Sequence, residues 1–248
     1  TVDNTGQIPE TNELNNSLYS DSLPVYDVLY GLLFPDWKIK YFRMDWGMTN
    51  PGIFDSFYYV STIFVGGVYP VADNRYLPEK ASRMFEIPSI YRGLDGKLSG
   101  FELGVWLSEL AKELVIANPQ MDQAVATVPP NWFSNFTTIN DTVGVYYPLL
   151  PVVVSEAINA NYTGPSIAAH ELGHSYGLGW FCEEYDDCNL SRQGGIGNYA
   201  NSGLLVSQKE PILDRTVYCF MGGYDPSKEY WIEAVDYDAL MWHPSNNL

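Results

Sequence analysis

The chain has 248 residues, of which 46% are hydrophobic and 15% aromatic, and its formal net charge is −17. This length and apolar content are sufficient for the core of one large domain. Such a negative charge repels nucleic acids at long range, so polynucleotide binding is not expected. The acidity has two interpretations, solubility in salty or acidic surroundings and calcium (Ca2+) sites formed by clustered carboxylates.

The N-terminal third of the chain mixes polar and apolar segments. Residues 1–22 are polar and lack periodicity, which indicates an extended arm. A short helix is predicted at Val25 to Leu33 and a strand at Trp37 to Trp46, followed by a turn region at Gly47 to Gly52. The uncharged run at Phe57 to Val71 is interrupted by glycines and is short for a membrane span, so it predicts a pair of strands and no transmembrane segment.

The middle of the chain predicts a helix and then a sheet. Ser99 and Glu102 form a capping box, and apolar residues recur at helical spacing to about Ala117. Three short strands are predicted at Ala124 to Val128, Val143 to Tyr147 and Val152 to Val154. Prolines at their ends limit how far each strand can pair. A second helix is predicted from Pro165 to Gly177, and a last helix from Lys228 to Trp242. The alternation of elements predicts an α/β fold with a twisted, mixed sheet.

The second helix carries the segment His170-Glu171-Leu172-Gly173-His174, an H-E-x-x-H motif. Its two histidines lie one turn apart on one helix face, so both can bind the same metal ion, and zinc (Zn2+) suits imidazole ligands. Glu171 then lies beside the metal, where a carboxylate can act as the general base that activates water. The simpler alternative is a pair of surface histidines without a metal.

Two motifs together resemble the metzincin clan of zinc peptidases. Gly177 extends the first motif to H-E-x-x-H-x-x-G, and Cys219-Phe220-Met221-Gly222-Gly223 is similar to the tight Met-turn of that clan. The resemblance implies a metzincin-like zincin with a twisted mixed sheet, an active-site helix and a C-terminal helical subdomain. It also implies that Met221 lies beneath the metal, whereas the alternative for Met221 is an ordinary core methionine.

This sequence lacks the histidine that serves as the third zinc ligand in the metzincin clan. Trp180 stands where the clan has its third histidine, and an indole N–H cannot bind zinc. The following segment, Cys182 to Cys188, is acidic and resembles the ligand segment of immune inhibitor A type peptidases. The resemblance implies Glu183 as the third ligand, with Asp186 and Glu184 as alternatives, and Asp187, a cysteine or no third protein ligand as the remaining possibilities. A calcium loop or a solvated turn are the other interpretations of this segment.

Several features favour export to an oxidising, extracellular compartment. The chain begins with Thr1 instead of Met, which we interpret as a processed mature form. Three cysteines suit one disulfide and one remaining thiol, and we expect the disulfide to join Cys182 and Cys188. Acceptor sites for N-linked glycans begin at Asn15, Asn135, Asn140, Asn161 and Asn189. The expected location is therefore secreted or cell-surface.

We expect an N-terminal arm at 1–22, an upper subdomain with the sheet and active-site helix at 23–177, and a lower subdomain at 178–248. The predicted function is a secreted zinc-dependent endopeptidase that hydrolyses peptides or unfolded proteins. Substrate is expected to pair with an edge strand through Val143, Gly144 and Val145. The alternative is a catalytically silent surface or structural glycoprotein of the same fold.

Overall fold

The computed structural model describes residues 36–47, 50–69, 71, 75–118, 120–139, 142–157, 164–176, 178, 203–205, 210–212, 217–221 and 229–231. All of these residues belong to one compact unit, Asp36–Leu248. The predicted arm at 1–22 and the predicted helix at Val25 to Leu33 lie outside the described residues. The proposed division at residue 177 also stays a prediction.

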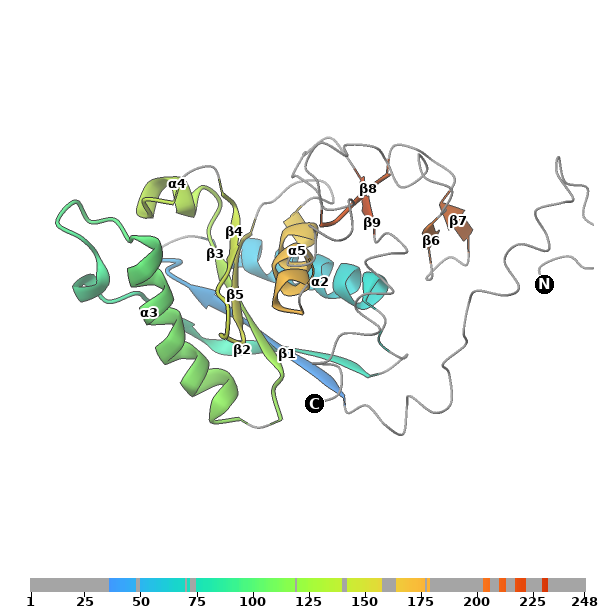
Figure 1. Cartoon of the computed structure of the whole chain (residues 1–248), viewed down its shortest axis with the longest axis horizontal. Helices are drawn as coiled ribbons and strands as arrows, with labels where there is room; N and C mark the ends of the chain where they lie inside the picture. Colours follow the sequence, from blue (N-terminus) through green and yellow to red (C-terminus); the bar gives the residue numbers. More distant parts are fainter. Residues whose placement is uncertain are drawn as a thin grey trace, which may run out of the picture. The chain divides into compact units, whose positions relative to one another are not determined.

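The described unit is built on a five-stranded mixed sheet with the strand order β2-β1-β3-β5-β4 (Figure 1). Its strands are β1 (Trp37–Met44), β2 (Tyr76–Phe85), β3 (Gln123–Val128), β4 (Gly144–Tyr146) and β5 (Val152–Glu156). The first three and β5 run parallel, and β4 pairs antiparallel with β5 at the edge. The predicted α/β fold with a mixed sheet is confirmed.

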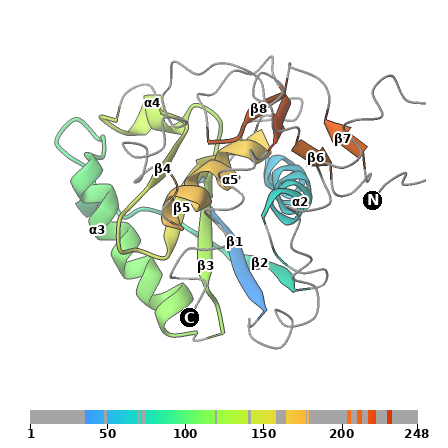
Figure 2. The same cartoon turned by 45° about the vertical axis from the view of Figure 1, so that its right-hand side comes forward.

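Helices cover both faces of this sheet. Helices α2 (Pro51–Val68) and α5 (Gly164–Ser175) pack against each other on one face (Figure 2). Helix α3 (Gly100–Ala111) lies on the other face and continues as the π-helix η3 (Lys112–Ile116). Two short elements complete the described helical structure, namely the 3-10 helix η2 (Ser89–Tyr91) and α4 (Trp132–Phe136).

The predicted strands correspond to β1, β3, β4 and β5, and the predicted capping box is present at the start of α3. The Ser99 side chain accepts a hydrogen bond from the backbone N–H of Glu102, and the Glu102 carboxylate accepts one from the backbone N–H of Ser99. Strand β2 is absent from the predicted elements. Its sequence contains Pro78 and three charged residues, which obscure the alternation typical of a strand.

The prediction of a strand pair at Phe57 to Val71 is wrong, because this segment is helical as far as Val68, the last residue of α2. The helix begins inside the expected turn region, where the side chain of Asn50 accepts from the backbone N–H of Gly52 and Pro51 occupies the first turn. Its buried residues recur every three or four positions, at Phe54, Phe57, Ser61, Val65 and Val68. Helical periodicity therefore outweighs the two glycines and the β-branched residues of the segment.

Short strand pairs follow α5. Strand β6 (Gly203–Leu205) pairs antiparallel with β7 (Glu210–Ile212), and β8 (Val217–Cys219) pairs parallel with β9 (Glu229–Trp231). The predicted helix from Lys228 to Trp242 is wrong at Glu229–Trp231, which form β9, whereas the predicted C-terminal helical subdomain stays a prediction. Aromatic residues suit a paired strand at this position, and the rest of the predicted helix lies outside the described residues.

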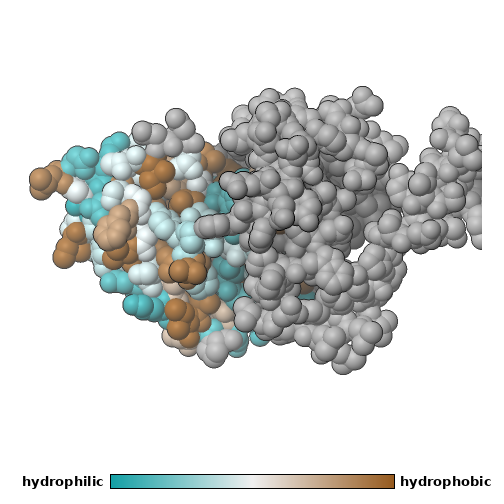
Figure 3. Space-filling view, viewed as in Figure 1, coloured by the Kyte–Doolittle hydropathy of each residue, from teal (hydrophilic) through white to brown (hydrophobic). Residues whose placement is uncertain are grey.

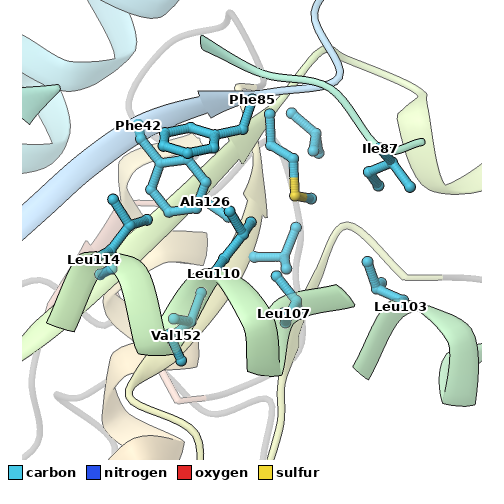
Figure 4. Close-up of a cluster of buried hydrophobic side chains, with 14 of the residues drawn as sticks. Phe42, Phe85, Ile87, Leu103, Leu107, Leu110, Leu114, Ala126 and Val152 are labelled. Atoms are coloured by element: carbon cyan, nitrogen blue, oxygen red, sulfur yellow. The ribbon is translucent and has the colours of Figure 1, made fainter. Parts of the chain in front are cut away.

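Each face of the sheet has its own hydrophobic core. On the α3 face, the side chains are mainly aliphatic and include Leu103, Leu107 and Leu110 (Figure 4). On the α2 and α5 face they are largely aromatic. The fully or nearly buried aromatic residues there are Tyr41, Trp46, Phe54, Phe57, Tyr69 and Phe220. This aromatic core supports the helix that carries the H-E-x-x-H motif.

Some large apolar side chains remain on the surface near α3, among them Ile90, Leu94 and Phe101. Over the part of the surface coloured in Figure 3, hydrophobic and hydrophilic residues are interspersed. No helix in the described ranges has the length and apolar character needed to cross a membrane.

Candidate metal centre

One side of helix α5 is buried in the core, and the two motif histidines lie on the same helix as a candidate metal site. Ile167, Ala168 and Leu172 are buried in the aromatic core. His170 and His174 are partly exposed and follow one another after one helical turn. The helix therefore presents both imidazoles from a rigid support.

The two imidazole rings face each other edge to face. Their Nε2 atoms are 3.0 Å apart, and the ring centroids are 4.5 Å apart with an interplanar angle of 89°. The other nitrogen of each ring meets a backbone carbonyl. Nδ1 of His170 lies 2.9 Å from the carbonyl oxygen of Phe220, and Nδ1 of His174 lies 2.9 Å from that of Leu178.

These three contacts require more protons than two neutral imidazoles carry. A carbonyl oxygen only accepts, so each Nδ1 must hold a proton to bind its carbonyl. Both Nε2 atoms then direct lone pairs at each other across 3.0 Å, which is repulsive without a positive charge between them. Burial of the ring, and after it the neighbouring His174, lowers the pKa of His170 to about 4, so a third proton is disfavoured at neutral pH.

A metal cation between the two Nε2 atoms would resolve this deficit, and the donor set fits zinc. Tetrahedral zinc at about 2.0–2.1 Å from each imidazole nitrogen separates the two nitrogens by about 3.3 Å. The observed 3.0 Å is close to that separation. The carbonyls of Phe220 and Leu178 bind the far nitrogen of each ring, which is the usual arrangement around histidine ligands of metals.

Glu171 lies one position round the helix and is buried, with 7% of its surface exposed. Burial raises the pKa of its carboxyl to about 8. A dication held by the neighbouring histidines would lower that pKa again, because a positive charge favours the carboxylate. Among the described residues, none forms a hydrogen bond to this carboxylate, and burial alone accounts for the shift of its pKa.

Strand β4 passes directly beside Glu171. A Cβ atom added to Gly144 would lie 2.6 Å from Oε1 of Glu171 and 2.8 Å from Cγ2 of Ile167, so this close approach requires glycine. Tyr146, two residues further on the same strand face, has its ring 6.4 Å from that of His174 and nearly parallel to it. The edge strand therefore lies along the motif helix.

The pairing of β4 with β5 determines which backbone groups face outward. The backbone N–H of Glu156 donates to the carbonyl of Val143, and Val145 pairs with Val154 two residues later. Hydrogen-bonded and non-hydrogen-bonded pairs alternate in antiparallel strands, so Val145 also bonds to β5, whereas Gly144 and Tyr146 direct their backbone groups away from it. The Gly144 carbonyl accepts from the Thr142 hydroxyl at 2.6 Å, which agrees with this assignment.

Met221 lies against the opposite side of the motif helix. A Cβ atom on Gly173 would be 2.5 Å from Sδ of Met221, so the sulfur packs directly on the helix between the two histidine positions. The preceding residue, Phe220, is 2% exposed and supplies the carbonyl that binds His170. The structure thus brings together the two motifs that are far apart in the sequence.

The remaining predicted ligands belong to a segment outside the described residues. Glu183, Asp186 and Glu184 lie outside the described residues, as do Trp180 and the pair Cys182 and Cys188. Over the ranges that the structure covers, no group of three or more His, Cys, Asp or Glu side chains could hold a metal ion. The third ligand and the disulfide therefore stay predictions.

Sequence reasoning missed the carbonyls of Phe220 and Leu178 and the outward-facing backbone of Tyr146. Backbone carbonyls leave no signature in the sequence, although the position of Phe220 immediately before the Met-turn methionine is a partial signal. Tyr146 could have been found from the alternation of strand β4, once its register with β5 is known.

The sequence matches no protein-family model and no curated protein. Among solved structures, it matches a zinc-dependent peptidase from Methanocorpusculum labreanum with 12% sequence identity and a TM-score of 0.38. This match covers 57% of the present chain and 82% of the other chain.

Proposed function

We propose that this chain is a zinc-dependent peptidase in which His170 and His174 hold the metal and Glu171 is the general base. The observation that carries the proposal is the set of three nitrogen contacts that two neutral imidazoles cannot satisfy. A buried carboxylate next to this pair supports hydrolysis instead of a purely structural metal site.

When bound, zinc supplies an acidified water and polarises a substrate carbonyl. Glu171 accepts the proton of the attacking water at its carboxylate and then delivers it to the leaving amine. The adjacent β4 backbone limits the space around the carboxylate, because no side chain fits at Gly144. Phe220 and Leu178 keep the histidine rings in the tautomer whose Nε2 atoms are free to bind the metal.

The substrate proposal places an extended peptide antiparallel to β4, as an added strand of the sheet. It is supported by the edge position of β4 and by its contact with Glu171. Of the residues predicted from sequence, Gly144 directs its backbone groups outward, whereas those of Val143 and Val145 are directed to β5. We therefore assign the main-chain contacts to Gly144 and Tyr146. Such binding favours unfolded chains as substrates, because the backbone groups of a folded protein are already paired. It is also compatible with endopeptidase activity.

The direct test is the zinc content of the purified protein after dialysis, measured by mass spectrometry together with hydrolysis of a denatured protein. We expect about one zinc per chain in the wild type and in His243→Ala, which removes the histidine outside the motif. His170→Ala and His174→Ala should lose both zinc and hydrolysis. Equal zinc in all four proteins would remove the two motif histidines from the site.

Zinc binding without any hydrolysis would favour the catalytically silent alternative.

We also propose that the protein is exported. The proposal is supported by the acceptor site at Asn135, whose side chain is exposed on α4. Mass spectrometry of the natural protein should find a glycan at this residue. An unmodified Asn135 peptide, together with free thiols at Cys182 and Cys188, would argue against secretion.

A further inference from the structure

Tyr69 lies in the aromatic core beside the helix that carries the H-E-x-x-H motif. It follows the last residue of α2, is 6% exposed, and has both its backbone N–H and its backbone carbonyl in hydrogen bonds. Its N–H donates to the carbonyl of Val65 at 3.1 Å, and its own carbonyl accepts from the N–H of Val71 at 2.8 Å. The side chain therefore starts from a fixed position.

The hydroxyl of Tyr69 donates to the carbonyl of Ala169 at 2.6 Å, in the buried interior. Ala169 immediately precedes His170 and is fully buried. Within an α-helix, a carbonyl at this position has the N–H four residues later as its partner. The bond from Tyr69 is thus additional to the helix's own pattern, and its effect is to fix α5 relative to α2.

The ring of Tyr69 makes a second connection to the same histidine. Its centroid is 5.9 Å from that of Phe220, the residue whose carbonyl binds Nδ1 of His170. Trp37 and Tyr176 pack on the Tyr69 ring with centroid distances of 4.9 and 6.3 Å, and Trp37 donates a hydrogen bond to the Tyr176 hydroxyl. Tyr69 therefore contacts both the helix that carries His170 and the segment that orients its ring.

We infer that Tyr69 is a positioning residue for the metal centre, which sets the place of His170 through the Ala169 carbonyl and its orientation through Phe220. This inference rests on the proposed function. A side chain that positions a ligand from two directions limits how far the imidazole must move when the metal binds. Loss of one of these contacts should therefore weaken metal binding in the folded protein.

The test compares Tyr69→Phe with Tyr41→Phe. Each variant removes one buried tyrosine hydroxyl from the same core, but the Tyr41 hydroxyl lies near Ser61 and Tyr76 at 3.4 and 3.1 Å and has no bond to α5. Zinc affinity is measured by competition with a chromophoric chelator, and ligand geometry by the visible absorption of the cobalt(II)-substituted protein. Thermal unfolding of the metal-free variants reports the general loss of stability.

For Tyr69→Phe we expect zinc to bind about fivefold more weakly, the equivalent of one ordinary hydrogen bond, with a shifted cobalt spectrum. Tyr41→Phe should keep the wild-type affinity and spectrum although it unfolds at a lower temperature. Wild-type values for Tyr69→Phe, or an equal loss in both variants, would overturn the inference. Absence of zinc binding in the wild type would instead contradict the proposed function.

Phe220→Leu provides the second variant, because it keeps the carbonyl that binds His170 and removes the aromatic contact with Tyr69. It is expected to weaken zinc binding in the same direction as Tyr69→Phe. If Tyr69→Phe does not fold, unchanged zinc affinity in Phe220→Leu overturns the inference.

Discussion

The two faces of the sheet differ in the composition of their cores and in the bonds made to the helices that cover them. On the α3 face, Leu103, Leu107 and Leu110 pack through apolar contacts over the strands. On the other face, hydroxyl and imidazole groups form directional bonds within an aromatic core, among them Tyr69 to Ala169 and His170 to Phe220. The α3 face stabilises the fold mainly through buried apolar area, whereas the bonds on the other face also fix the orientation of individual side chains.

This difference agrees with the proposed function, in which only the α5 face holds a metal. Apolar packing is non-directional, so it stabilises the sheet without defining the angle of any one group. A metal centre requires its ligands within about 0.5 Å of their working positions, which hydrogen bonds from neighbouring elements can provide. Mutations on the two faces should therefore separate stability from metal binding.

The largest expected effect on stability is on the α3 face. Leu107 is fully buried, and Leu107→Ala should lower the free energy of unfolding by about 2–5 kcal/mol, measured by urea denaturation. Leu94, which is fully exposed, provides the control, since Leu94→Ala should be nearly neutral. The folded Leu107→Ala protein should bind zinc as the wild type does. A large loss of zinc affinity there would show that the two faces are not separate.

On the other face, Glu171→Gln should lower the turnover of a peptide substrate by about a hundredfold or more while zinc stays bound, because only the base is lost. Glu109→Gln, on the exposed side of α3, is the control and should keep full turnover. Unchanged hydrolysis by Glu171→Gln would remove this carboxylate from the mechanism.

Strand β4 allows the two faces to be compared within one element, because the side chains of successive residues lie on opposite faces of the sheet. Tyr146→Pro removes an outward backbone donor, whereas Val145→Pro removes a donor to β5. Relative to Tyr146→Ala, we expect Tyr146→Pro to lower kcat/KM for a denatured protein about fivefold, the equivalent of one hydrogen bond. Val145→Pro should mainly destabilise the fold. Equal kcat/KM for Tyr146→Pro and Tyr146→Ala would contradict substrate pairing with β4.

The sequence predicts best what local interactions determine. The capping box of Ser99 and Glu102 and the strands β1, β3 and β5 follow from spacing within a few residues. The β-branched and aromatic residues of the α2 segment predict strands locally, and its glycines predict a break between them, whereas its buried stripe becomes decisive only against the sheet and α5.

The candidate site shows the same division. The motif identifies His170, Glu171 and His174, because their spacing along one helix is sufficient to bring them together. The carbonyl partner from Phe220, 50 residues away, depends on tertiary packing. The same is true of Tyr69, which is 100 residues from Ala169. Residues that act through backbone carbonyls carry no recognisable side-chain pattern, so only the structure reveals them.

The smallest predicted effect concerns the start of α3, where the cap is local and lies on the face opposite the motif helix. Ser99→Ala should lower the free energy of unfolding by about 1 kcal/mol, since one helix N–H loses its acceptor.

The same cap has a pH dependence. Hydrogen bonds from the backbone and hydroxyl of Ser99 lower the pKa of Glu102. A carboxyl with a lowered pKa in the folded state stabilises the protein above its ordinary pKa, and this contribution disappears as the pH falls through the lowered value. The difference in unfolding free energy between wild type and Glu102→Gln should therefore be present at neutral pH and shrink in acid. A difference that does not change with pH would show that the ionised carboxylate of Glu102 is not the form that caps the helix. Altered zinc binding in Ser99→Ala or Glu102→Gln would contradict the separation of the two faces.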